Sequence, residues 1–142
     1  MTIESPPLYD TAVQNDGKLT SRWSIFVDNL YRGDSGELWT PTFQNLTVTG
    51  SPTITGKYFR VSEYLKYFTI TIDPSTDTSS TAGTTYCDNF PLTIANDGAC
   101  LAIGGVLGLN SGIVDASTNR IYPPSWSGVT VPVTIVGLAE AN

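Results

Sequence analysis

The side chains that could do chemistry in this sequence are mainly carboxylates. The chain of 142 residues carries 13 Asp and Glu, 7 Lys and Arg, and no histidine. Two carboxyl groups that face each other at about 5–9 Å can hydrolyse a glycosidic bond. Most of the acids, however, stand beside Gly, Asn, Pro or Ser, where turns place solvated carboxylates. We therefore rank a polysaccharide depolymerase that uses two carboxylates below a non-enzymatic role.

Two pairs of acids are close enough in sequence to share a calcium ion. They are Asp73 with Asp77, and Asp34 with Glu37. Calcium takes about six to eight oxygen ligands, and neither pair lies in a recognisable calcium-binding loop. We therefore expect no metal ion and no other cofactor.

Ser35 is the best-placed serine for nucleophilic chemistry, within Gly33-Asp34-Ser35-Gly36. This tetrapeptide is similar to the nucleophile motif of chymotrypsin-like proteases. Such a serine needs a histidine to accept its proton, and the chain has none. The same lack removes the usual general base near neutral pH and most zinc sites. Gly, Asp and Ser are common turn residues, so the tetrapeptide predicts a turn. We expect that the protein is not an enzyme.

The two cysteines, Cys87 and Cys100, could form a disulfide or remain free. The polar N-terminal stretch Met1–Asp10 does not have the pattern of a secretory signal. Without export, free buried thiols are favoured over a disulfide. We expect a soluble protein that is made in a cytoplasm.

The charge balance argues against a nucleic-acid partner. The net charge is −6 and the sequence pI is about 4.3. Phosphate backbones require a patch of Lys and Arg, whereas the 7 basic residues are scattered along the chain. No stretch approaches the roughly 20 apolar residues of a membrane-spanning helix. We therefore expect neither nucleic-acid binding nor membrane insertion.

The stretch Gly50–Asp73 predicts two antiparallel strands joined by the turn Val61–Tyr64. The second strand alternates strictly, with Phe68, Ile70 and Ile72 on one face and tyrosine and threonine on the other. A strand of this kind buries one face and wets the other, as in an antiparallel sheet.

One helix is predicted, at Ser21–Tyr31, after an extended arm at Met1–Lys18. About three turns of helix are unstable alone in water, so the apolar stripe of this helix must be buried. It packs either on the sheet of its own chain or on copies of itself around a symmetry axis. As subunit-interface residues we single out Trp23, Phe26, Val27 and Leu30.

The most apolar run is Ala99–Leu109, which predicts a core strand with a bulge at Gly104-Gly105. Burial of this run in a subunit interface is the alternative, because so apolar a segment is rarely left exposed. Pro74–Thr85 is expected to be a polar loop. Alternating valines near the C-terminus predict a closing strand.

These elements predict an all-β fold, an antiparallel sandwich of about seven to nine short strands. We divide the chain into an N-terminal arm and helix, residues 1–36, and a β-sandwich domain, residues 37–142. Aromatic rings on strands and beside loops could contact sugars or proteins. As candidate surface-binding aromatics we single out Tyr64, Tyr67 and Trp126.

Several short motifs follow one another in a fixed order between about Thr20 and Gly137. A Trp/Phe/Leu helix and an alternating Tyr/Phe/Ile strand belong to that order. The remaining motifs are Trp39-Thr40-Pro41, Phe43, Leu46, Gly50, Gly56-Lys57-Tyr58, Pro91, Ile121-Tyr122-Pro123 and Gly137. This layout resembles small virion proteins and fibre-tip domains of tailed bacteriophages.

The resemblance implies a jelly-roll-like sandwich that assembles as a homotrimer on a capsid or tail, with no shared catalytic residues. On this basis we expect a structural virion protein, either a capsid decoration (cement) protein or a fibre knob. It would assemble in the host cytoplasm and attach to other virion proteins through its N-terminal arm. The alternative is a receptor-binding adhesin that recognises a host surface glycan.

Overall fold

In the computed structural model, residues 36–105 and 107–142 are described, and they form strands and turns without a helix. The predicted all-β, antiparallel class is confirmed for this part of the chain. Residues 38–142 make one compact unit. The predicted arm and the predicted helix at Ser21–Tyr31 lie outside the described residues, so the division at residue 36 stays a prediction.

The described residues contain 13 strands, more than the number expected from the sequence. They are β1 (Glu37–Trp39), β2 (Phe43–Gln44), β3 (Thr47–Thr49), β4 (Thr53–Arg60), β5 (Leu65–Asp73), β6 (Asp77–Ser80), β7 (Tyr86–Cys87), β8 (Ile94–Asn96), β9 (Gly98–Gly104), β10 (Leu107–Asp115), β11 (Arg120–Tyr122), β12 (Trp126–Val129) and β13 (Val133–Ala141). The excess comes from strands of two to four residues, which are too short to show a periodic pattern.

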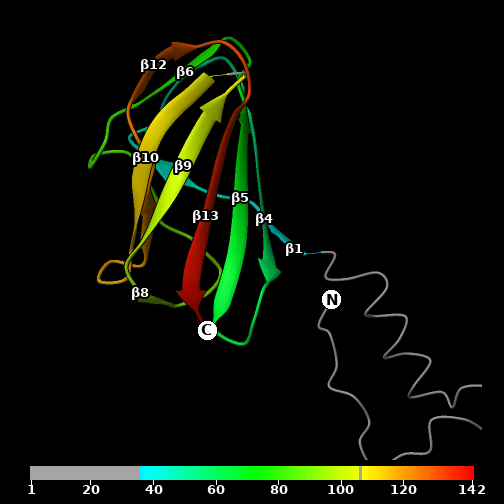
Figure 1. Cartoon of the computed structure of the whole chain (residues 1–142). Coiled ribbons are helices and arrows are strands. Elements are labelled where there is room, and N and C mark those ends of the chain that lie inside the picture. The colour runs from blue at the N-terminus through cyan, green and yellow to red at the C-terminus, as the bar shows by residue number, and fades with distance from the viewer. Residues whose placement is uncertain (1–35, 106) are drawn as a thin grey trace, which may run out of the picture. The chain divides into compact units, whose positions relative to one another are not determined.

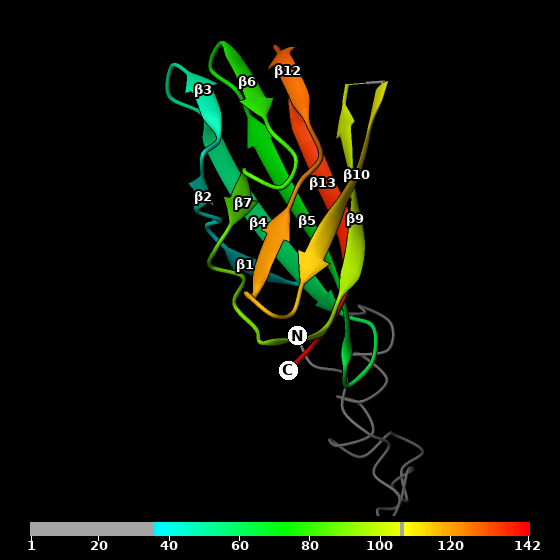
Figure 2. The same ribbon diagram turned by 90° about the vertical axis from the view of Figure 1, so that its left-hand side faces the viewer.

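Ten strands form one large sheet and three form a smaller one (Figure 1). The large sheet runs β1-β4-β5-β13-β9-β10-β11-β7-β2, with β8 paired to β13, and the small sheet runs β12-β6-β3. The large sheet curls, so that β11 and β7 lie over one face of β5 and β13 (Figure 2). The side chains between these layers form the core.

The predicted pair of strands around Val61–Tyr64 is confirmed. Strand β4 pairs with β5 from Thr53↔Asp73 to Arg60↔Lys66, and the Val61 amide closes the turn on the Leu65 carbonyl at 2.9 Å. Alternation on β5 buries the predicted apolar face completely, because Phe68, Ile70 and Ile72 are 0% exposed. The other face of β5 points away from the core.

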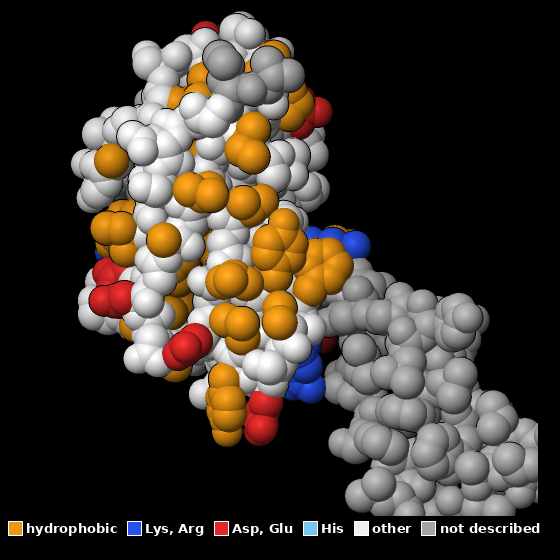
Figure 3. Space-filling model, in the orientation of Figure 1, with side chains coloured by type: hydrophobic (Ala, Val, Ile, Leu, Met, Phe, Trp, Pro, Cys, Tyr) orange, Lys and Arg blue, Asp and Glu red, His pale blue; other side chains and the backbone are white. Residues whose placement is uncertain are grey.

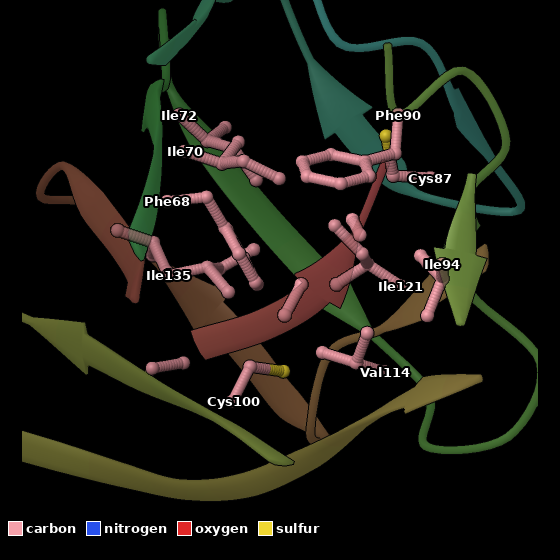
Figure 4. Close-up of a cluster of buried hydrophobic side chains, with 14 of the residues drawn as sticks. Phe68, Ile70, Ile72, Cys87, Phe90, Ile94, Cys100, Val114, Ile121 and Ile135 are labelled. Carbon is pink, nitrogen blue, oxygen red and sulfur yellow. The ribbon is translucent and has the colours of Figure 1, made fainter. Parts of the chain in front are cut away.

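The core joins side chains from both layers of the curled sheet (Figure 4). It consists of Phe68, Ile70, Ile72, Cys87, Phe90, Ile94, Cys100, Ala102, Val114, Ile121, Trp126, Val133, Ile135, Ala139 and Ala141. The Phe90 ring lies between the rings of Trp39 and Phe68, at centroid distances of 5.5 and 5.7 Å. Both cysteines are free, buried thiols, which confirms the favoured interpretation.

The polar segment Pro74–Thr85 is only partly the loop expected from its composition. It contains β6, which is the middle strand of the small sheet. Thr78 and Ser80 are buried there, although serine and threonine made this segment look solvated. The hydroxyl of Thr78 accepts a hydrogen bond from the buried Trp126 indole, and this bond offsets the cost of removing the hydroxyl from water.

The apolar run Ala99–Leu109 is not one strand with a bulge, so that prediction is wrong. It makes the hairpin of β9 and β10, whose turn follows Gly104 and includes Gly105 at φ 68°. The register irregularity lies further on, between Gly108 and Asn110. Within the described residues, no helix could cross a membrane.

Candidate functional site

The outer face of the large sheet carries side chains that point away from the core on β4, β5, β13, β9 and β10. Strand alternation places them there, opposite the buried residues of the same strands. We call this surface the outer apolar face. It consists of Phe59, Leu65, Tyr67, Ala99, Leu101, Ile103, Ile113, Val136 and Leu138.

Strand register makes these side chains neighbours rather than scattered residues. Tyr67 on β5 pairs with Phe59 on β4 and with Leu138 on β13. The rings of Phe59 and Tyr67 lie 5.9 Å apart. In the next row, Val136 on β13 pairs with Leu101 on β9. Paired residues on one face lie within about 5.5 Å of each other, so the apolar surface is continuous across the strands.

Three aliphatic side chains of this face are more than half exposed. Leu101, Ile113 and Leu138 have exposed fractions of 55%, 58% and 51%. Figure 3 shows hydrophobic side chains gathered over the β4, β5, β13 and β9 side of the molecule. Single exposed apolar residues are normal, whereas a contiguous apolar patch marks an interaction surface. The outer apolar face is therefore the candidate site.

A shallow groove of about 690 Å³ runs over this face. Leu65, Tyr67, Leu101 and Leu138 are among its lining residues, which also include polar groups at the end of β8 and in the turn that follows it. One of these, the Asn96 side-chain amide, donates a hydrogen bond to the carboxylate of Glu140, another residue of the lining. The groove is thus apolar along its floor and acidic at one end.

A cation lies on the other side of the face, on β4. The Lys57 ammonium is 5.2 Å from the centre of the Phe59 ring. A lysine in this position packs its aliphatic stem on apolar surface and keeps its charge at the rim. The outer apolar face therefore has opposite charges on its two sides.

Lys66 is the one described lysine that the fold buries, with an exposed fraction of 4%. Its ammonium donates to the carbonyl of Glu63 at 2.6 Å and to the carbonyl of Ala141 at 2.9 Å. Burial lowers the pKa of Lys66 below its ordinary value; the nearby Arg60 charge lowers it further, and the Glu63 carboxylate opposes both. Both acceptors are backbone carbonyl groups, so Lys66 connects the end of β13 to the β4–β5 hairpin.

Asp115 and Asp88 accept hydrogen bonds from nearby side chains and so stabilise the loops next to them. Asp115 accepts from Ser117 and Thr118 at 2.7 Å each, and these bonds lower its pKa. Asp88 accepts from Thr42 and Gln44, with the Thr42 bond the larger cause of its lowered pKa. A lowered pKa suits a permanent acceptor and not a general acid at neutral pH.

Neither proposed calcium pair gains support as a site. Asp77 accepts a hydrogen bond from the Thr49 hydroxyl at 3.0 Å, across the small sheet. Asp34 lies outside the described residues. Within residues 36–105 and 107–142, no three His, Cys, Asp or Glu side chains gather where they could hold a metal ion.

The thiols of Cys87 and Cys100 are in the core. Burial raises the pKa of each thiol to about 11. At neutral pH both are therefore protonated, and the thiolate is the reactive form of cysteine. Their place in the structure is that of small apolar core residues.

The structure separates the three candidate surface aromatics. Tyr64 is 59% exposed in the β4–β5 turn and Tyr67 is 37% exposed on the outer apolar face. Trp126 is only 6% exposed, and its indole N–H donates to Thr78 at 3.0 Å. We correct the expectation for Trp126: it is a residue of the hydrophobic core and not a surface-binding aromatic.

The residues singled out as a subunit interface lie outside the described residues, so their role stays a prediction; they are Trp23, Phe26, Val27 and Leu30. Ile113 and Leu138 belong to the outer apolar face although their sequence context did not single them out. A signal for Leu138 was available, because β13 carries apolar residues on both faces from Ile135 to Ala139. Such a strand has no polar face to put in water.

Comparison of the chain with protein-family models, with curated proteins and with solved structures gives no significant match.

Proposed function

We propose that this chain is a non-enzymatic structural protein of a tailed-bacteriophage virion. It is a self-associating surface protein, a capsid decoration protein or a fibre knob, that attaches through residues 1–36. Its two antiparallel sheets form a jelly-roll-like sandwich, and the assembled unit is a homotrimer. This proposal keeps the function, the partners and the location that the sequence resemblance implies.

The observation that carries the proposal is the outer apolar face. Three of its aliphatic side chains, Leu101, Ile113 and Leu138, are each more than half exposed. Removing apolar surface from water contributes roughly 25 cal/mol per Å² to association, against which stands the entropy lost when the partners are held together. A face of this composition is typical of a protein that works in an assembly, where neighbouring subunits cover it.

The polar groups add support for a structural role. Lys66, Asp88 and Asp115 are held in hydrogen bonds within the fold, and burial keeps both thiols protonated at neutral pH. Catalytic groups instead meet one another in a cleft, with pKa values tuned to near the working pH. A structural virion protein needs no such catalytic groups, because its function is to bind other virion proteins.

The test is attachment to virions. Mass spectrometry of purified particles should find the chain at a fixed copy number, and particles stripped of the chain should rebind it when it is added back. Deleting Met1–Lys18 should abolish rebinding while circular dichroism and the unfolding temperature stay unchanged. Particles that lack the chain, or that bind the truncated and full-length proteins equally well, would contradict the proposal.

A receptor-binding adhesin is the second candidate, and the exposure of Tyr64 favours it. Tyr64 is 59% exposed at the tip of the β4–β5 hairpin. It lies three residues after Val61, which is also 59% exposed. Exposed tyrosine rings stack on sugars with little loss of conformational freedom. Binding to a glycan array that Tyr64→Ala abolishes would favour this function, with Val61→Ala as the matched control at the same tip.

A further inference from the structure

We propose that two copies of this chain pack outer apolar face against outer apolar face, about a two-fold axis that lies between the two sheets and passes over Tyr67. The inference deepens the proposed function and rests on it, because it names one surface through which copies of a self-assembling protein meet. The occupant of the face is thus a second copy of the chain. Two sheets then stack at the usual spacing of about 10 Å, with interdigitating side chains.

Two opposite charges lie on either side of Tyr67 on the outer apolar face. Tyr67 pairs with Phe59 on β4 and with Leu138 on β13. Lys57 lies two residues before Phe59, and Glu140 lies two residues after Leu138. Because β4 and β13 both run antiparallel to β5, these two steps lead in opposite directions. Each charge is therefore one strand and two residues from Tyr67, about 8 Å away by sheet geometry.

This placement makes the face complementary to itself. A two-fold axis that lies between the two sheets, at right angles to the line from Lys57 to Glu140, sets Lys57 of one copy opposite Glu140 of the other. Two-fold symmetry repeats the pair, so both charges of both copies are matched. Opposite charges at mirrored positions fix the register of a contact and disfavour other partners.

The exposed apolar area of the outer apolar face is large enough for a stable interface. The exposed parts of five side chains present on the order of 450 Å² of largely apolar surface; they are Tyr67, Leu101, Ile103, Ile113 and Leu138. A standard stable interface buries about 800 Å² on each partner, of which rather more than half is apolar. The outer apolar face supplies that apolar share, and the surrounding polar rim supplies the rest.

This two-fold contact is distinct from the homotrimer proposed for the N-terminal segment. If residues 1–36 hold three copies together, contacts between outer apolar faces join trimers in pairs. If they do not, the same contact joins single chains. In either case, breaking the two-fold contact halves the mass of the assembly.

The test measures the mass of the full-length protein by light scattering during gel filtration, over a series of concentrations. Leu138→Glu places a charge in the centre of the contact and should halve the mass. Val48→Glu is the matched control, because Val48 is an exposed strand valine of the small sheet. It should leave the mass unchanged.

Charge reversal tests the register of the two copies. Lys57→Glu and Glu140→Lys should each weaken association at least ten-fold, because each sets like charges opposite each other twice. The double variant K57E/E140K should recover most of the lost affinity. An equimolar mixture of the two single variants should also recover it, because every facing pair in the mixed complex is again opposite in sign.

Two results would overturn the proposal. One is a wild-type mass equal to that of Leu138→Glu at every concentration, as expected if another part of the chain or another virion protein covers the face. The other is a contact that neither the double variant nor the mixture restores. Neither result concerns attachment to virions, which is measured separately, so a failure here is distinguishable from a failure of the proposed function.

Discussion

The ring of Phe68 lies against the backbone of Gly137 on the neighbouring strand. The two residues are register partners in the β5–β13 pair. A Cβ atom at Gly137 would lie 2.6 Å from Cζ and 2.8 Å from Cε1 of the Phe68 ring, too close for any real contact. Glycine at this position therefore lets a fully buried ring pack against the backbone of the neighbouring strand.

Gly137→Ala should destabilise the protein by about 2–3 kcal/mol, because the ring must leave its position in a filled core. The free energy of unfolding in urea measures the effect. Gly108→Ala is the matched control, since nothing lies within 4 Å of a Cβ atom at that position. It should change stability by less than about 0.5 kcal/mol. Equal effects of the two substitutions would contradict the packing argument.

Thr78→Val should cost about 1–3 kcal/mol, because it leaves the buried N–H of Trp126 without an acceptor. The hydroxyl of Thr78 accepts that N–H at 3.0 Å, and both side chains are buried. Valine has the shape of threonine, so the loss isolates the hydrogen bond. Thr78→Ser keeps an acceptor and should retain part of the stability. If valine and serine have equal effects in urea unfolding, packing rather than the hydrogen bond holds Trp126.

The central sheet was predictable because β5 follows a simple rule. Polar and apolar residues alternate from Tyr67 to Ile72, which indicates the buried face of β5. The turn at Val61–Tyr64 determines its partner strand. The small sheet was not predictable in this way. Strand β6 is made of polar residues, and its buried threonine is stabilised by a tryptophan 48 residues away. Local composition does not contain information on such a partner.

The candidate site was predictable only in part. The run Ala99–Leu109 was recognised as too apolar to be left in water, and the interface alternative fits its exposed residues Leu101 and Ile103. Its strand assignment failed because the glycines form a turn and not a bulge. Ile113 and Leu138 join the same face through register between strands far apart in sequence, which no single segment reveals.

Asn119→Gly should destabilise the protein by about 1–2 kcal/mol through lost hydrogen bonds. The side-chain oxygen of Asn119 accepts from the Ile94 amide at 2.7 Å, and its nitrogen donates to the Leu92 carbonyl at 3.2 Å. The residue also has φ 57°, a left-handed conformation that asparagine tolerates and glycine prefers. The glycine variant therefore keeps the backbone favourable and tests the hydrogen bonds alone.

Asn119→Ala should be worse than Asn119→Gly by about 1 kcal/mol, because alanine adds the cost of the left-handed conformation. Both variants are compared in urea unfolding, and hydrogen exchange at the Ile94 amide reports the lost bond directly. Ile94 is a core residue, so faster exchange there signals a loosened core. Unchanged exchange in both variants would show that the Asn119 side chain does not hold this loop.

Stability should fall between pH 9 and pH 11 because of the two buried thiols. Burial raises the pKa of Cys87 and of Cys100 from 9.0 to about 11. Within this range the folded protein keeps both thiol protons, whereas the unfolded chain releases them. The unfolded state thus binds fewer protons, and stability decreases as the pH rises. The contribution is fully present below pH 9 and amounts to roughly 3 kcal/mol for each thiol.

The double variant C87A/C100A isolates this effect. Its smaller side chains leave space in the core and lower stability at every pH, but the thiol-dependent part of the loss above pH 9 disappears. Tyrosine and lysine titrate in the same range, and their contribution is common to both proteins, so the difference between the two curves belongs to the thiols. Urea unfolding at pH 8, 9.5 and 11 should therefore bring the two free energies closer together as the pH rises. Curves that stay parallel would show that the thiols titrate in the folded protein as they do in the unfolded chain, and hence that the core around Cys87 and Cys100 admits water.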